Sequence, residues 1–109
     1  MTETIFEPQR QDLELAMILD ALSDPIRLRM VAELHARGEA ACGTVLVDIP
    51  KSTRSHHLKV LREAGVTRTR MEGTERIVRL RYDCVEARFP GLLTSVLASL
   101  KMMPAKVRP

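Results

Sequence analysis

The stretch KSTRSHHLKVLREAG, at residues 51–65, places strong limits on how the chain can fold. Leu58, Leu61 and Ala64 recur at helical spacing, so we expect a helix that begins at Lys51 or Ser52 and ends at Ala64. Gly65 suits the left-handed position that follows the last turn of many helices. Polar and basic side chains fill the rest of this helix. It is therefore expected to bury one narrow stripe and to expose the remainder.

The segment directly after this helix, VTRTRMEGTERIVRLRYD, predicts a β-hairpin. Residues 66–71 and 76–82 are rich in strand-forming side chains, and Glu72-Gly73-Thr74 lies between them. A short element, a tight turn and a charged helix are the parts of a helix-turn-helix, and a basic hairpin behind them adds a wing. A DNA major groove about 12 Å wide admits one helix, and a hairpin beside it can reach the backbone or the minor groove.

Helices are expected over most of the remaining chain. Residues 11–22 show a broad apolar face at helical spacing. Asp24-Pro25 is typical of an N-cap followed by proline at the first helical position, so the next helix should run from Pro25 to about Ala36, with Gly38 ending it. Residues 90–103 carry a strong apolar stripe and predict a last helix.

Residues 40–47 are short and apolar, and their sequence leaves a two-turn helix and a strand equally open. Aromatic residues make up only 3% of the chain, which favours an aliphatic core built from helices over a sandwich or a barrel. The predicted fold is therefore mainly α with a β-hairpin wing. With 109 residues, it should form one domain over 1–109, with loosely ordered ends at 1–9 and 104–109.

Charge is distributed unevenly along the chain. Residues 51–82 carry nine Lys or Arg and three Glu, a formal charge of +6, whereas the rest carries eight basic and eleven acidic residues, a charge of −3. Such asymmetry indicates a surface that binds a polyanion. The chain begins without an apolar signal sequence, and no apolar stretch reaches the roughly 18 to 20 residues of a membrane span, so a cytoplasmic location is expected.

The adjacent histidines in the basic helix do not predict a metal site. Neighbouring helical positions point about 100° apart, so His56 and His57 do not converge on one ion. We expect His57 to pack at the helix edge beside Leu58 and His56 to face outward. No cofactor and no metal are expected, and no set of nucleophile, base and orienting residue indicates an enzyme.

Two segments, LSDPIRLRMVAEL (22–34) and STRSHHLKVLREAGVTRTRMEGTERIVRLR (52–81), resemble the winged-helix repressors of the ArsR/SmtB type. Asp24, Pro25, Arg27 and Leu28 match the first family motif; Ser52, Thr53, Ser55, His57, Leu58, Leu61, Ala64 and Gly65 match the second. The resemblance covers roughly residues 12–82. It implies a homodimer that binds double-stranded, palindromic operator DNA and releases it on a signal.

The resemblance and the charge pattern together predict the DNA-binding residues. Base edges would be met by the first turns of the recognition helix, and phosphates by its basic side chains. The expected set is Ser52, Thr53, Ser55 and His56 for bases, Lys51, Arg54 and Lys59 for phosphates, and Arg68, Arg70, Thr74 and Arg76 on the wing. Arg54 departs from the family pattern, which has an apolar residue there, and its side chain could extend outward to a phosphate.

In this family the first and last helices form the dimer interface. The corresponding apolar side chains here are Leu13, Met17, Leu93, Val96, Leu97 and Leu100. The alternative is that these stripes only cover the core of a single chain.

The signal is the part that the sequence defines least. Metal-sensing relatives often carry a Cys-x-Cys pair, whereas this chain has Cys42 alone in the matching stretch and no histidine on its last helix. Cys42 and Cys84 are a candidate thiol sensor, because some relatives are similar in using two cysteines as a redox switch. The alternative is two buried cysteines that act as small hydrophobic side chains. An alternative function, a winged-helix module that binds protein without reading DNA, is disfavoured by the basic stretch.

Overall fold

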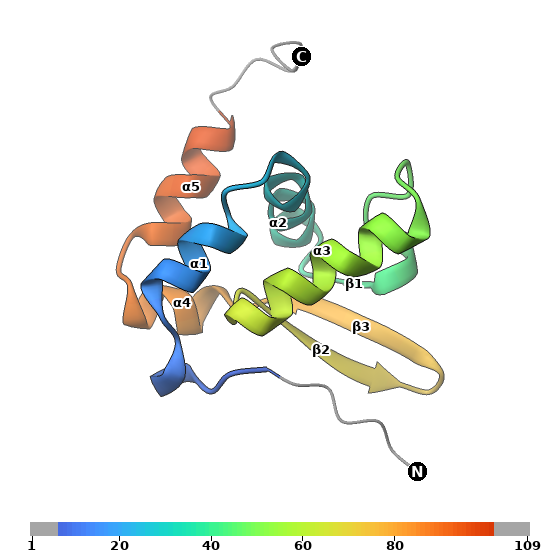
Figure 1. The fold of residues 1–109 in the computed structure, drawn as a ribbon, viewed down its shortest axis with the longest axis horizontal. Helices are drawn as coiled ribbons and strands as arrows, with labels where there is room; N and C mark the ends of the chain where they lie inside the picture. Colours follow the sequence, from blue (N-terminus) through green and yellow to red (C-terminus); the bar gives the residue numbers. More distant parts are fainter. Residues whose placement is uncertain (1–6, 102–109) are drawn as a thin grey trace.

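The computed structural model describes residues 7–101, and Figure 1 shows how the elements are arranged. The predicted loose segment 104–109 lies outside the described residues. The elements are a 3-10 turn (Arg10–Asp12), α1 (Leu15–Ala21), α2 (Pro25–Arg37), β1 (Glu39–Ala41), a second 3-10 turn (Cys42–Thr44), α3 (Lys51–Ala64), β2 (Thr67–Glu72), β3 (Glu75–Leu80), α4 (Tyr82–Arg88) and α5 (Leu92–Lys101). The predicted class, mainly α with a hairpin wing, is confirmed.

The predicted start and end of α2 are both present. The Asp24 side chain accepts hydrogen bonds from the backbone N–H groups of Ile26 and Arg27 at 2.8 and 3.1 Å, which satisfies two donors that a helix start leaves free. Pro25 is the first helical residue, and Gly38 ends the helix with φ +85°. The local sequence is therefore sufficient to define this helix.

The hairpin extends into a three-stranded sheet with the order β1-β3-β2. β2 and β3 pair antiparallel with Thr67 opposite Leu80 and Glu72 opposite Glu75, close to the predicted strands. β1 pairs with the other edge of β3, with Ala40 opposite Val78. Residues 40–47 are thus neither one helix nor one strand: they divide into part of β1, a 3-10 turn and a loop.

The predicted helix over 11–22 is shorter and interrupted. A 3-10 turn is followed by extended backbone at Leu13 and Glu14, and α1 begins only at Leu15. The interruption turns the Leu13 side chain inward, where it is 2% exposed. α4 has no counterpart among the predicted helices, and α5 begins at Leu92 instead of Pro90.

Of the end predicted to be loose over residues 1–9, the structure describes residues 7–9, and these are hydrogen-bonded to the rest of the fold; residues 1–6 lie outside the described residues. Glu7 accepts a hydrogen bond from the Arg68 side chain at 2.7 Å. The carbonyl of Pro8 accepts another at 2.7 Å from Arg81, whose side chain is buried. Residues 7–9 therefore belong to the fold.

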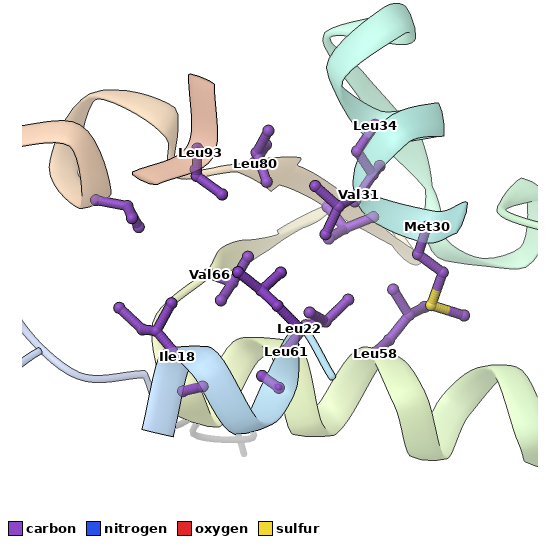
Figure 2. Packing of buried hydrophobic residues seen from close by; sticks show 14 of the residues in the cluster. Ile18, Leu22, Met30, Val31, Leu34, Leu58, Leu61, Val66, Leu80 and Leu93 are labelled. Carbon is purple, nitrogen blue, oxygen red and sulfur yellow. The ribbon is translucent and has the colours of Figure 1, made fainter. Parts of the chain in front are cut away.

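The core lies between α3, the helices α1, α2 and α5, and the inner side of the sheet. Figure 2 shows Ile18, Val31, Leu61, Val66 and Leu93 converging from different elements, and all five are fully buried. Burying one such side chain contributes about 1.5–3 kcal/mol. Val85 of α4 is fully buried in the same core, so aliphatic side chains anchor all five α-helices of the described residues.

Among the glycines, Gly65 has the least space for a side chain. It follows α3 in the left-handed conformation with φ +89°, as predicted. A β-carbon at this position would lie only 2.1 Å from Cδ2 of Leu13. The glycine thus lets the segment before α1 pass directly over the end of α3.

Replacing Gly65 should therefore destabilise the protein more than replacing another glycine of positive φ. We expect Gly65→Ala to lower the free energy of unfolding by about 2–4 kcal/mol, since backbone strain adds to the displacement of Leu13. The measurement is urea denaturation. Gly91→Ala is the control, because Gly91 has φ +84° but no atom lies within 4 Å of the point that its β-carbon would occupy. Equal losses for both variants would contradict the role of the Leu13 contact.

Candidate nucleic-acid interface

The exposed side of α3 carries most of the residues predicted to bind DNA. Lys51, Ser52, Ser55, His56 and Lys59 are exposed, and Thr53 and Arg54 are half-buried. No side chain caps the start of this helix, which follows Pro50. The first-turn amides are therefore available to an acceptor, and the positive end of the helix dipole points the same way.

The loop before α3 is held by three side chains of α2. Arg29 pairs with Asp48 at 3.0 Å, Glu33 accepts from the Leu46 amide at 3.4 Å, and Arg37 donates to the Thr44 carbonyl at 3.2 Å. Leu46 adopts φ +47°, which is uncommon for a residue other than glycine. These bonds fix the path of a turn that lacks a regular helix, and so they fix where α3 begins.

Arg54 does not enter the core, although it begins the stripe that continues at Leu58. Its guanidinium reaches back toward the carbonyl of Ile49 at 3.5 Å. It lines a groove of about 610 Å³ between the start of α3, the Cys42–Thr44 turn and the hairpin turn. Lys51 and Arg76 also line this groove, so three basic side chains gather between the recognition helix and the wing.

The four predicted wing residues divide into two groups. Thr74 and Arg76 line the groove beside α3. Arg68 instead pairs with Glu7, and Arg70 contacts Glu39 at 2.8 Å and Glu72 at 3.1 Å. The hydrogen bond from Arg70 lowers the pKa of Glu39, so the pair stays charged at neutral pH. Much of the charge on Arg68 and Arg70 is therefore balanced within the chain.

His56 and His57 differ in their surroundings, as expected. His56 is exposed, whereas His57 is 8% exposed at the edge of α3. Nδ1 of His57 lies 3.0 Å from Nη1 of Arg27, a contact that the sequence did not predict. Among residues 7–101, no group of three or more His, Cys, Asp or Glu side chains is placed to hold a metal ion.

The two cysteines lie at opposite ends of β3. Cys42 directly follows Ala41, which pairs with Ile77, whereas Cys84 lies in α4 beyond the far end of the strand (Figure 1). Both are free thiols. The strand residues nearest to them in the fold are Ile77, opposite Ala41, and Leu80, which ends β3 before α4. These two residues are about 10 Å apart along the strand, more than a disulfide spans. Burial raises the pKa of the Cys42 thiol, whereas the positive charges of Arg76, Arg62 and Arg54 act to lower it. In this conformation the two thiols do not form a disulfide within one chain.

The residues predicted for a dimer interface are only partly at the surface. Leu13, Leu93 and Leu97 are buried within the single chain, which is the alternative that the sequence left open. Val96 and Leu100 are half-buried along α5, and Met17 is 47% exposed. Leu15 and Leu19, which are outside the predicted interface set, are 45% and 48% exposed and lie one turn apart on α1. No described helix is long and apolar enough to cross a membrane.

Comparison with known proteins identifies relatives along most of the chain. A family model described as a helix-turn-helix domain matches residues 22–70. The chain is 41% identical over 91 residues to the uncharacterized HTH-type transcriptional regulator YceK of Bacillus subtilis, covering 81% of this chain and 91% of YceK. It is 38% identical over 77 residues to the HTH-type transcriptional repressor SmtB of Mycobacterium tuberculosis, covering 67% of this chain and 56% of SmtB.

A solved structure supports the same assignment. It is the homodimeric winged helix-turn-helix DNA-binding domain of Mb0332 from Mycobacterium bovis, described as a possible ArsR-family transcriptional regulator. It superposes with a TM-score of 0.64 at 28% identity, covering 80% of each chain. The fold, the family model and these relatives show that the chain belongs to the ArsR/SmtB-type winged helix-turn-helix transcriptional regulators.

Proposed function

We propose that this chain is a homodimeric repressor that binds palindromic, double-stranded operator DNA through α3 and the turn of the wing. The observation that carries the proposal is the two-sided character of α3. One side is buried with Leu58, Leu61 and Ala64, and the other presents polar and basic side chains beside a basic groove. A helix of this kind can enter a major groove without disturbing its own core.

The exposed residues of α3 divide by the chemistry of their side chains. Ser52, Ser55 and His56 can exchange hydrogen bonds with base edges, and half-buried Thr53 can assist from the first turn. Lys51, Arg54 and Lys59 suit phosphates, which fix the position of the protein but carry no sequence information directly. On the wing, Thr74 and Arg76 are the proposed contacts. Arg68 and Arg70 are proposed to stabilise the sheet instead, because both have carboxylate partners.

The proposed homodimer is supported by the surface of α1 and α5 and by one structural neighbour. Leu15 and Leu19 form an exposed apolar pair on α1, and Leu92, Val96 and Leu100 are half-buried at intervals of four residues on α5. Mb0332, which shares the fold, is described as homodimeric. Two copies related by a two-fold axis would present two α3 helices to half-sites roughly 34 Å apart. Because the proposed ligand is operator DNA, the proposed location is the cytoplasm.

The direct test is selection of binding sites from a library of random DNA duplexes. The proposal expects a recovered consensus with two inverted half-sites about one helical turn apart. Recovery of no consensus, together with capture of a protein partner through the same α3 surface, would instead support a protein-binding module.

Affinity for the selected duplex should fall steeply as salt rises, because phosphate contacts release counterions. Lys59→Ala should weaken binding similarly for all sequences and reduce the slope of log K against log salt by about 1 per protomer. Fluorescence anisotropy at several salt concentrations measures both quantities. Lys101→Ala is the control, since this exposed lysine at the end of α5 is neither a proposed DNA contact nor one of the proposed apolar dimer contacts. A Lys59→Ala slope equal to that of the control would exclude Lys59 as a phosphate contact.

His56 and Arg54 should differ in what they contribute to DNA binding: His56 to sequence discrimination and Arg54 to overall affinity. His56→Ala should reduce the discrimination between the selected duplex and a scrambled one, by roughly 1–3 kcal/mol if a base contact is lost. Arg54→Ala should weaken binding to both duplexes alike, as expected of a phosphate contact. Competition titrations with the two duplexes measure these effects. The assignment fails if His56→Ala leaves discrimination unchanged.

Introducing charge on the outer flank of α1 should dissociate the dimer. Leu19→Glu places a carboxylate in the proposed interface and should shift the protein to the monomer in analytical ultracentrifugation, while its circular dichroism stays native. Val47→Glu is a suitable control, because Val47 is 73% exposed in the loop before α3. A dimer that persists in Leu19→Glu would show that this flank of α1 is not the interface.

A further inference from the structure

We propose that Arg27 and His57 form a positioning pair that holds the recognition helix in the orientation DNA binding requires, and that the pair forms only while His57 is neutral. The proposal rests on the proposed DNA-binding function of α3. Neither residue is among the proposed DNA contacts: His57 is buried, and the guanidinium of Arg27 is bonded between Ala21 and His57 inside the chain.

Arg27 connects three helices through one side chain. From α2, its Nε donates to the carbonyl of Ala21 at 2.7 Å and its Nη2 to that of Asp20 at 3.4 Å, both on α1. Its Nη1 lies 3.0 Å from Nδ1 of His57 on α3. A planar guanidinium fixes the directions of these bonds, so the side chain sets the angle between α1 and α3 and not only their distance.

The contact with Arg27 determines the protonation state of His57. A guanidinium can only donate, so Nδ1 must be the acceptor, and the ring proton must be on Nε2. Protonating the ring would place a second donor and a second positive charge against Arg27. Burial also lowers the pKa of His57, and the charges of Arg27 and His56 act in the same direction.

Asp24 opposes these effects and gives the protonated ring another partner. Its Oδ1 lies 4.0 Å from Nδ1 of His57, and its negative charge raises the pKa of His57. The same oxygen accepts the N-cap hydrogen bonds from Ile26 and Arg27. A protonated His57 would therefore be repelled by Arg27 and drawn toward the N-terminus of α2, which moves α3 relative to α1.

The sign of the resulting pH effect follows from these groups. The charged groups that face His57 are Asp24 and Arg27 from α2 and His56 from α3, whose ring centroid lies 5.1 Å away. Because the folded chain disfavours the imidazolium, the pair is intact at and above the ordinary histidine pKa of about 6.5. It is lost only as the pH falls through the lowered pKa of His57. His56 lies at the proposed DNA surface and is therefore replaced in the experiment.

The experiment removes the contribution of His56 first. In a His56→Gln background, operator affinity is measured by anisotropy from pH 5.5 to 8.0 at constant ionic strength, with urea denaturation at each pH as a check on folding. We expect affinity to fall several-fold as the pH drops through the lowered pKa of His57, below the ordinary histidine value of about 6.5. Adding His57→Asn keeps an acceptor near the position of Nδ1 but removes titration, so binding should stay tight and independent of pH. Adding His57→Leu leaves Arg27 without its acceptor on α3 and should weaken binding roughly tenfold at every pH.

Two results would overturn the proposal. One is an unchanged pH dependence after His57→Asn; the other is equal affinity of the His57→Leu and His57→Asn variants. A second readout does not depend on DNA: amide chemical shifts along α3 of the free His56→Gln protein should titrate with the His57 ring and stop doing so in the His57→Asn variant. If no duplex is bound at any pH, the proposed function fails. The proposal of a positioning pair is then tested by this NMR titration alone. Amide shifts along α3 that do not follow the protonation of His57 would refute it.

Discussion

One narrow stripe on α3 determines how the rest of the structure is arranged. Leu61 is fully buried, and Leu58 and Ala64 are nearly so. Figure 2 shows Leu58 and Leu61 of α3 in the same core as Ile18 of α1 and Met30 of α2, and α3 contacts both helices that precede it. Because an α-helix turns once every 3.6 residues, burial of these positions directs Ser52, Ser55 and Lys59 away from the core. The proposed recognition surface is thus a consequence of how α3 packs.

Charged side chains then separate structural from recognition roles. Wing arginines near the base of the hairpin have carboxylates beside them: Glu7 for Arg68 and Glu39 for Arg70. The basic side chains at the start of α3 line an open groove instead, with Arg54 directed toward the Ile49 carbonyl and not toward an acid. The number of basic residues in this stretch therefore overestimates the size of the proposed DNA-binding surface, because some of them are paired with carboxylates of the same chain.

The sequence predicts those elements whose signals are local. The Asp24 cap, Pro25 and Gly38 define α2, and the periodicity before Gly65 defines α3. β1 could not be predicted, because its three residues form a strand only by pairing with β3, some 38 residues away. α4 is only seven residues long and shows no strong periodicity, and the break at Leu13 exists because that side chain packs over Gly65.

The same distinction applies to the candidate site. The proposed α3 contacts follow from the sequence, because helical geometry assigns most of them to a face. The pairing of Arg68 with Glu7 and the contact between Arg27 and His57 join residues separated by 61 and 30 positions, and nothing in either local sequence indicates them. Likewise, the burial of Leu93 and Leu97, as opposed to Val96, depends on how α5 meets the core.

The central claim is that α3 and the hairpin turn form the DNA-binding surface. NMR titration of the labelled protein with its selected duplex tests this most directly, because every backbone amide reports separately. We expect the largest shift changes at residues 51–59 and at Thr74 and Arg76, with small changes along α4. Changes concentrated on α4 or on the outer face of the sheet, with α3 unaffected, would contradict the claim.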